Sequence, residues 1–272
     1  MKSKRATAFI GIITFVVCSF AAEAQQASDP RVADAIQAGK LRTGLGLGSP
    51  ALAIKDSKSG EVRGPALDLA RALATKIGVQ LEVVEYPRPG AVLQGIQNNE
   101  WDVTFLVADP ARSAEADFSP PYMQTDYTYL VPAGSSKHSV ADLDQPGVHI
   151  AVPRGDGSDL RLTKMLKHAE LVRADSIAAI IDMVRAGQVD AYAGPRVALL
   201  KLSDQSPGSR VLGDGFAEIT YVAMVPKGKG GRIAYVSDFI EEAKSSGLVQ
   251  RTIDQYGLRG IRVAGAKTSG AR

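Results

Sequence analysis

An arginine stands a few residues beyond a predicted strand in this 272-residue chain. The strand covers residues 103–107, Arg112 follows it, and a compact aromatic turn containing Phe118 and Tyr122 comes next. In open parallel sheets, ligands sit at the carboxyl ends of the strands. A guanidinium group is a planar, permanently charged fork that suits a carboxylate. We therefore expect Arg112 to hold a carboxylate of a ligand in a cleft. The alternative is that Arg112 forms a salt bridge within the protein, either on the surface of one lobe or between two lobes.

Two further arginines and one tyrosine are candidate ligand contacts. Arg196 follows Pro195 at a predicted helix start, where it either adds a second positive charge for a dicarboxylate or is a solvated helix residue. Arg88 lies in a proline-rich turn, and turns are normally exposed. Tyr86 ends a predicted strand, where it either stacks on a ligand or caps the core of its lobe.

Acidic and hydroxyl side chains gather at the start of another predicted helix, over residues 158–168. Asp156 and Asp159 flank this start, which is typical of N-terminal capping and of a charge that complements the helix dipole. The functional alternative is that Asp156 pairs with an amine of the ligand. Ser158 and the first free amides of the helix could instead hold an anion.

The chain shows no pattern of a metal centre or a catalytic nucleophile. Its three histidines, His138, His149 and His168, lack the spacing of metal ligands. The glycine-rich residues 44–48 precede Ser-Pro rather than a helix, so the setting of a dinucleotide loop is missing. No nucleophile elbow or histidine-centred triad is visible. These features favour a binding protein without a cofactor or metal over an enzyme.

Residues 1–24 have the pattern of a cleavable export signal. Three cations precede an apolar stretch over residues 6–17, and Ala22-Glu23-Ala24 is a small-residue cleavage site. The apolar stretch is short for a membrane-spanning helix. We therefore expect a periplasmic protein. Lipid attachment at Cys18 is disfavoured, because Val17 is large for the residue that precedes a lipidated cysteine.

The mature chain is nearly neutral and lacks thiols. Without the signal, 29 basic and 28 acidic residues remain. That balance gives no argument for binding to nucleic acid or to a membrane surface. The one cysteine of the sequence, Cys18, lies within the signal, so disulfides and cysteine-based sites are excluded from the mature chain.

Strand-like and helix-like segments alternate along the chain, which predicts mostly parallel sheets covered by helices. In the first series, strands cover residues 41–45, 79–86 and 103–107, and helices cover 65–77 and 91–98. Residues 127–131 form a strand that leads out of this series. In the second series, strands cover 148–152, 189–193 and 220–225, and helices cover 158–168 and 176–185. Helices over 233–245 and 249–256 complete the first series.

This order predicts two α/β lobes joined by two crossing segments, with a cleft between them. Residues 25–131 and 221–262 form lobe 1, and residues 132–220 form lobe 2. Residues 263–272 form a disordered tail.

Six segments in order resemble the family 3 (polar amino acid type) periplasmic solute-binding proteins. The most specific is Asp109-Pro110-Ala111-Arg112 followed by Asp117-Phe118-Ser119 and Pro121-Tyr122; the others are residues 64–79, 95–102, 187–191, 247–248 and 256–258. The resemblance implies a two-lobed type II clamshell that closes on a small polar solute and delivers it to an ABC permease. It also implies that Arg112 grips the ligand α-carboxylate, that a first-lobe aromatic stacks on the ligand, and that a second-lobe aspartate pairs with its α-ammonium.

The chain departs from this family pattern at several ligand positions. Pro195 stands where the aspartate is expected, so an ammonium group there would be desolvated without a partner, which costs several kcal/mol. The positions that usually supply hydroxyl or aromatic contacts are occupied by residues 155–158 (Gly-Asp-Gly-Ser), Phe105, Val107 and Ala51. This interpretation retains recognition of a carboxylate and disfavours recognition of an amino acid.

These features lead to one main functional hypothesis and two alternatives. The main one is the monomeric substrate-binding component of an ABC importer for a small carboxylate-bearing solute. An exported cyclohexadienyl or arogenate dehydratase with the same fold is the first alternative, with Asp156 or Asp159 as the general acid. A receptor that reports its ligand to a membrane kinase or chemoreceptor is the second.

Overall fold

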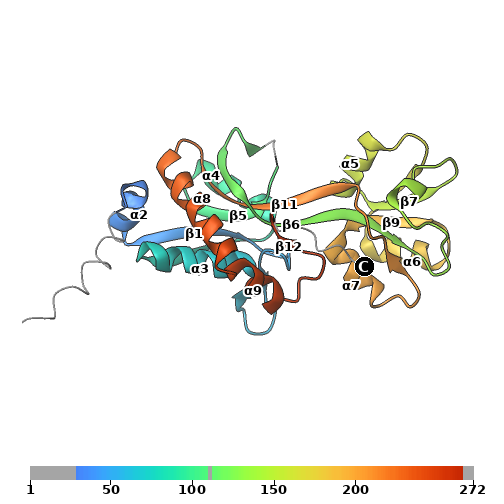
Figure 1. The fold of residues 1–272 in the computed structure, drawn as a ribbon, viewed down its shortest axis with the longest axis horizontal. Coiled ribbons are helices and arrows are strands. Elements are labelled where there is room, and N and C mark those ends of the chain that lie inside the picture. The colour runs from blue at the N-terminus through green and yellow to red at the C-terminus, as the bar shows by residue number, and fades with distance from the viewer. Residues whose placement is uncertain (1–28, 110–111, 266–272) are drawn as a thin grey trace, which may run out of the picture.

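The computed structural model describes residues 29–109 and 112–265, and Figure 1 shows two lobes side by side along the long axis of the molecule. Lobe 1 contains η1 (Pro30–Val32), α2 (Ala33–Ala38), β1 (Lys40–Gly46), β2 (Ile54–Lys55), β3 (Val62–Arg63), α3 (Pro65–Ile77), β4 (Gln80–Tyr86), η2 (Pro89–Ala91), α4 (Gln94–Gln97), β5 (Val103–Val107), α8 (Gly230–Ser245), α9 (Leu248–Gln255) and β12 (Arg262–Val263). Lobe 2 contains η4 (Val140–Asp142), β7 (His149–Pro153), α5 (Gly157–Met165), β8 (Glu170–Ala174), α6 (Ile177–Arg185), β9 (Ala191–Pro195), α7 (Arg196–Ser203) and β10 (Arg210–Val211). Two long strands, β6 (Ala116–Val131) and β11 (Ala217–Pro226), pass from one lobe to the other.

One sheet runs through both lobes. Within the described residues it has ten strands, in the order β4-β1-β5-β11-β6-β9-β7-β8, with β10 and β12 also paired to β6. The pairs at both wings are parallel, whereas β6 and β11 pair antiparallel with each other and with their neighbours. The expected α/β class with mostly parallel wings flanked by helices is confirmed.

The first helix of lobe 1 shows why the sequence pattern could be interpreted. Pro65 starts α3 at its first position, where a missing N–H costs nothing, and Gly78 ends it in the left-handed conformation at φ 83°. Its apolar stripe is buried, with Leu69, Ala70 and Leu73 each 0% exposed. The helix therefore seals one face of the lobe 1 sheet.

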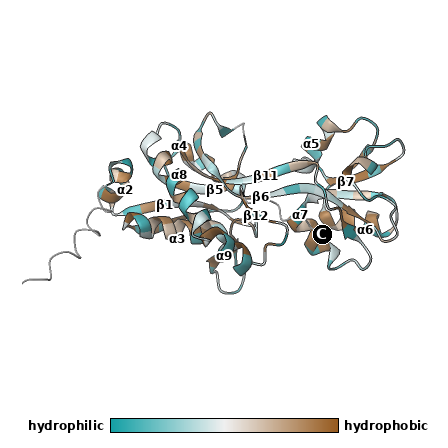
Figure 2. Ribbon diagram, in the orientation of Figure 1, coloured by the Kyte–Doolittle hydropathy of each residue, from teal (hydrophilic) through white to brown (hydrophobic). Residues whose placement is uncertain are grey.

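The apolar core is divided between the lobes. The largest cluster comprises residues from 32–123 and 219–261, including Trp101, which is 0% exposed and donates from Nε1 to the Val92 carbonyl at 2.8 Å. Two smaller clusters on the two faces of the lobe 2 sheet comprise residues from 129–216. Figure 2 shows strongly hydrophobic segments inside both lobes and paler ones on β6 and β11 between them.

Three expectations about elements are wrong, and the strand β8 was not expected. The helix expected over residues 91–98 is reduced to η2 and the four-residue α4, and Gly95 within α4 lowers the helix propensity of this segment. The strand β8 was missed, because its pattern is short and half exposed. The compact aromatic turn after Arg112 is instead the start of β6, where a register shift opposite Val222 accommodates two prolines. The tail begins later than expected, since Val263 belongs to β12 and Ala264 is 4% exposed.

Residues 1–24, including Cys18, and residues 266–272 lie outside the described residues. The export signal and the rest of the tail therefore stay predictions.

Candidate ligand-binding cleft

A cavity of about 740 Å³ lies between the two lobes. Lobe 1 lines it with residues 48–51, Val107 and residues 256–259, and lobe 2 lines it with Ile177, Tyr192, Pro195 and one face of α7. Tyr127 of β6 and Tyr221 of β11 contribute from the crossing strands. The cavity is therefore built from both lobes and from the segments that join them.

Parallel strands from both lobes end at this cavity. β1 and β5 run parallel, and the chain enters the cavity wall just after β1 and at Val107, the last residue of β5. β9 runs parallel to β7 and ends at Pro195, which also lines the cavity. This is the position where open α/β sheets bind ligands.

Arg112 follows β5 in the sequence, and its side chain contacts the last residue of that strand. Its Nη1 donates to the Val107 carbonyl at 3.2 Å, and its Nε lies 3.6 Å from Oδ2 of Asp109. The side chain is 22% exposed. Val107 lines the cavity, whereas Arg112 is not among the described residues of the cavity wall. The structure thus places Arg112 at the border of the cleft, next to a carboxylate of its own loop.

The side chain of Arg196 binds other groups of the protein itself. Its Nε and Nη2 donate to the two carboxylate oxygens of Asp126 at 2.5 Å and 2.7 Å, and Nη1 donates to the Leu212 carbonyl at 2.7 Å. The side chain is 15% exposed. The interpretation of Arg196 as a solvated helix residue is wrong, because β6 supplies a bidentate partner that lies far away in the sequence.

Tyr86 packs on its own lobe. Its hydroxyl donates to the Glu100 carboxylate and lies so close to Gly95 that an added Cβ there would come within 2.1 Å of the oxygen. Burial, reinforced by this bond to Glu100, raises the pKa of Tyr86. These contacts favour the capping interpretation over ligand stacking. Arg88 is exposed in the turn before η2.

Asp156 caps α5. Its Oδ1 accepts from the backbone N–H of Ser158 at 2.8 Å, from the N–H of Asp159 at 3.0 Å and from the Ser158 hydroxyl at 2.6 Å. Ser158 is 0% exposed. Asp156 therefore satisfies the helix start, as the capping interpretation expects, and the Ser158 hydroxyl is bound to Asp156.

Asp159 lies in the first turn of the same helix, and its contacts favour the ionised carboxylate. Burial opposes the charge, but the Gly155 N–H at 2.8 Å, Thr163 and Arg173 at 2.9 Å overcome it, so the pKa of Asp159 lies below its usual range. A carboxyl group in this state is a poor proton donor at neutral pH.

Four tyrosines in the cavity wall were missed by the sequence analysis: Tyr127, Tyr192, Tyr221 and Tyr256. Burial raises the pKa of Tyr192 to about 12, with the nearby Asp156 charge as a second cause. The pKa of Tyr221 is also raised by burial. These phenols therefore stay neutral and can donate hydrogen bonds at physiological pH. Three of the four lie in strands, where alternation predicts a face but not which face meets the other lobe.

An ion pair spans the cavity wall from one lobe to the other. Arg259, which follows α9, places Nη1 at 3.1 Å and 2.9 Å from the carboxylate oxygens of Asp204 at the end of α7. Both side chains are more than half exposed, at 58% and 57%. Among the described residues of the wall, Asp204 is the one carboxylate, and this contact engages it.

Residues 41–259 match the model of the bacterial extracellular solute-binding proteins, family 3. The chain belongs to this family.

Two relatives of this family 3 protein are named as glutamine-binding proteins, one of them of an ABC transporter. It is 27% identical over 188 residues to a glutamine-binding protein of Geobacillus stearothermophilus, covering 67% of this chain and 71% of the relative. It is 24% identical over 198 residues to the ABC transporter glutamine-binding protein GlnH of Bacillus subtilis (strain 168), covering 71% of this chain and 72% of the relative.

Solved structures support the two-lobed type II fold of the family 3 chain. An ancestral cationic amino acid solute-binding protein matches with a TM-score of 0.67 and 24% identity, covering 83% of this chain and 98% of the other. An ancestral cyclohexadienyl dehydratase matches with a TM-score of 0.57 and 24% identity, covering 83% and 95%. At these identities the likeness concerns the fold alone.

Three positions at which this family 3 chain departs from the expected pattern, Ala51, Val107 and Pro195, line the cavity. The departures therefore belong to the cleft wall and not to a remote surface. In the described part of the chain, every helix is too short or too polar to cross a membrane.

Proposed function

We propose that this chain is the substrate-binding component of an ABC importer and binds a small carboxylate-bearing solute in the interlobe cleft. The observation that carries the proposal is the cavity between the lobes, with Arg112 anchored by the Val107 carbonyl at its border. The relatives named as ABC transporter and glutamine-binding proteins support the transport role. The partner is then a permease in the inner membrane, and residues 1–24 direct export to the periplasm.

The cleft chemistry favours an acid without an α-amine. Pro195 offers no counter-charge, and the Asp204 carboxylate is engaged by Arg259. An ammonium group would therefore lose its water without gaining an ionic partner. Tyrosine hydroxyls and apolar side chains instead suit the neutral end of an organic acid. The glutamine-binding relatives make an amino acid the main alternative ligand.

Ligand binding would act through the crossing strands. β6 and β11 join the lobes as two adjacent antiparallel strands, so small backbone changes near residues 127 and 219 can rotate one lobe against the other. A solute held by Arg112 from lobe 1 and by the α7 side from lobe 2 favours the closed arrangement, because it gains contacts from both lobes only there. The closed pair of lobes then presents the surface that the permease recognises.

A thermal-shift screen tests this proposal. The panel pairs each α-amino acid with the acid that lacks its amine, since a ligand of the native state raises the melting temperature by mass action. Upward shifts with the amine-free acids, lost in Arg112→Ala and kept in Arg71→Ala on the exposed face of α3, support it. Shifts confined to α-amino acids contradict the ligand assignment, and shifts that survive Arg112→Ala contradict the carboxylate clamp.

An exported dehydratase is the second candidate, because the same fold occurs in a protein named as an ancestral cyclohexadienyl dehydratase. The lowered pKa of Asp159 weighs against it, which leaves Asp156 as the candidate acid. Turnover of prephenate or arogenate by the purified protein would support the enzyme, whereas saturable binding without turnover supports transport or sensing. A dependence of import on the neighbouring permease separates transport from sensing.

A further inference from the structure

Three tyrosine hydroxyls in the wall of the interlobe cavity have no hydrogen-bond partner among residues 29–109 and 112–265. They belong to Tyr127, Tyr192 and Tyr221. The other tyrosine of the wall differs, because the Tyr256 hydroxyl donates to Oδ2 of Asp68 at 2.8 Å. The three unpartnered hydroxyls are therefore donors that the fold itself does not use.

Two of these hydroxyls belong to side chains that are almost completely buried. Tyr192 is 2% exposed and Tyr221 is 4% exposed. In the neighbouring Tyr122, whose ring centroid lies 6.5 Å from that of Tyr221, the unpartnered hydroxyl is sealed from solvent. The hydroxyls of Tyr192 and Tyr221 are not sealed in this way, so each keeps an accessible surface, and both residues line the cavity. Since buried tyrosine hydroxyls usually find a partner, this arrangement favours an acceptor supplied by a ligand.

Tyr127 stands beside the position from which the expected aspartate is missing. Its Cα pairs with that of Pro195 between β6 and β9, and directly opposed residues of antiparallel strands place their side chains on the same face. Burial raises the pKa of Tyr127, Tyr192 and Tyr221, so all three phenols are neutral at physiological pH. This part of the wall therefore offers uncharged hydrogen bonds where an amine would need a carboxylate.

The charged groups of the described wall leave an excess of one positive charge. They are Lys201, Asp204 and Arg259, and the last two pair with each other. The wall has no further carboxylate within the described part of the chain. An anionic ligand therefore suits the cavity better than a cationic one.

Most of the remaining wall is apolar. Six of its apolar side chains, four from lobe 2 and two from lobe 1, are Ile177, Val197, Leu200, Leu202, Val107 and Leu258. Ile177 is 49% exposed, so a ligand that covers it removes apolar surface from water. The cavity volume of about 740 Å³ lies within the range of about 300–1,000 Å³ that is typical of pockets for drug-sized ligands. An acid of two to four carbons would leave much of this wall in contact with water.

We propose that the cleft selects acids with a bulky apolar body, of the size of a six-membered ring, that carries an uncharged acceptor oxygen. This inference rests on the proposed function, because Arg112 would hold the carboxylate. The apolar side chains would cover the body of the ligand from both lobes. Tyr192 and Tyr221 would donate to its oxygen, and that bond would satisfy hydroxyls that have no partner in the free protein.

Calorimetry on the secreted chain tests the inference with acetate, phenylacetate and the 2-, 3- and 4-hydroxyphenylacetates. We expect phenylacetate to bind about tenfold or more tightly than acetate, because the two acids differ only by the ring. At least one hydroxyphenylacetate should bind about fivefold more tightly than phenylacetate, because it gains a hydrogen bond. Tyr192→Phe or Tyr221→Phe should remove this gain and leave the affinity for phenylacetate unchanged.

Tyr129→Phe is the matched control. Tyr129 is also buried, at 1% exposed, and lies on β6, but it is not part of the cavity wall that the structure describes. Its substitution should change neither the gain from the hydroxyl group nor the preference for the ring. A selective effect of Tyr192→Phe or Tyr221→Phe therefore cannot come from the loss of a buried phenol in general.

Three results would overturn the inference. Equal affinity for acetate and phenylacetate, with both lost in Arg112→Ala, contradicts it and leaves the proposed function standing. A hydroxyl gain that persists in both Tyr192→Phe and Tyr221→Phe, or that is lost equally in Tyr129→Phe, shows that these phenols do not read the ligand oxygen. Absence of binding by every acid, including those of the thermal-shift panel, contradicts the proposed function and the inference with it.

Discussion

Arg196 and Asp126 form a bidentate ion pair across two elements that are 70 residues apart in sequence, with donor–acceptor distances of 2.5 Å and 2.7 Å. The same guanidinium reaches the carbonyls of Leu212, Gly213 and Asp214. It thereby ties the start of α7 to β6 and to the loop that leads into β11. The pair stands where the chain passes between the lobes.

Replacing Arg196 tests this tie. Arg196→Ala leaves the half-buried Asp126 carboxylate without its partner, and we expect a loss of about 3 kcal/mol in the free energy of unfolding. Arg196→Lys should recover little of it, because an ammonium group lacks the planar fork. Urea unfolding followed by circular dichroism measures both. Full rescue by lysine would show that charge alone matters.

Pro195→Asp should restore an amine site. An aspartate at the end of β9 faces the cleft wall, and we expect the affinity for α-amino acids to rise about tenfold or more relative to the matching amine-free acids. Pro195→Asn is the control, since either residue can cap α7 but the amide carries no charge. Calorimetry with matched ligand pairs distinguishes them. Equal gains in both variants would attribute the effect to backbone or capping changes.

Two substitutions of Asp156 distinguish a role in helix capping from a role in ligand binding. Asp156→Asn keeps a side-chain oxygen for the α5 amides, whereas Asp156→Ala removes it and should cost about 1 kcal/mol of stability. If Asp156 only caps the helix, the asparagine variant binds ligand as tightly as the wild type. A large loss of affinity in Asp156→Asn, with stability maintained, would instead assign the carboxylate to the ligand.

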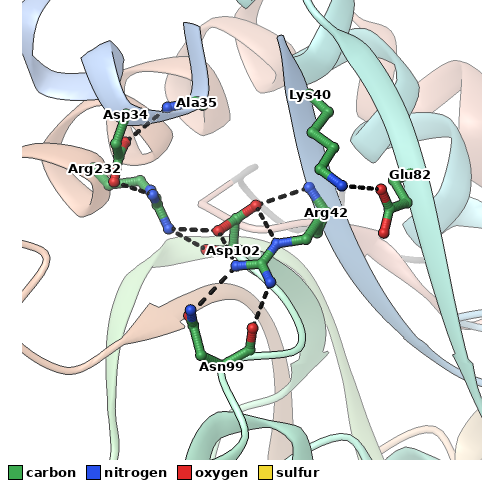
Figure 3. Close-up of polar contacts among 8 residues, drawn as sticks. All are labelled: Asp34, Ala35, Lys40, Arg42, Glu82, Asn99, Asp102 and Arg232. Carbon is green, nitrogen blue, oxygen red and sulfur yellow. Dashed lines mark hydrogen bonds and ion pairs between the residues drawn. The ribbon is translucent and has the colours of Figure 1, made fainter. Parts of the chain in front are cut away.

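Asp102 makes lobe 1 sensitive to acid. Burial opposes its charge, but bonds from Arg42 and the nearby Arg232 (Figure 3) hold the pKa of Asp102 below its usual value of about 3.9. Its contribution to stability is therefore complete above about pH 4 and is lost as the pH falls through the lowered pKa. Asp102→Asn should cost about 3 kcal/mol at neutral pH and flatten the acid limb of the stability curve. Melting curves from pH 2 to 7 check this, and an unchanged acid limb would contradict it.

Gly46 is the last residue of β1, and it allows this strand to pass close to the turn that contains Pro89. A Cβ at this position would lie 2.3 Å from the Pro89 Cα, a backbone atom that cannot turn aside. Gly46→Ala should therefore destabilise the fold by about 3 kcal/mol by displacing this turn. Gly213→Ala is the control, because its Cβ would meet nothing within 4 Å. Similar unfolding midpoints for the two variants would show that the turn yields easily.

The alternation of patterns along the chain was enough to predict the lobes, the α3 helix and most strands. These elements were predicted from local signals, such as Pro65 and Gly78 at the two ends of α3. The helix around α4 was predicted too long, since its glycine weakens the helical signal. The strand β8 was missed, since its partial exposure weakens the periodic signal of a strand. The long strand β6 was hidden by its prolines, which only the bulge against β11 accommodates.

The candidate site was predicted less completely. Sequence reasoning identified the strand end at Val107 and the departure at Pro195, and both line the cleft. It could not show that Arg196 pairs with Asp126, that Tyr86 packs on Gly95, or that four tyrosines enclose the cavity. Each of these depends on a partner from another part of the chain.

By itself, then, the sequence determined the two-lobed α/β order, the family pattern and the absence of an aspartate at Pro195, because periodicity, turn residues and residue identity are local properties. Only the tertiary structure decided which charges remain free for a ligand. Arg196 begins α7 and Asp204 follows its last residue, yet β6 engages one and the segment after α9 engages the other. An ionisable group becomes a binding site or a structural tie according to the charge that the fold brings beside it, and that neighbour is usually distant in sequence.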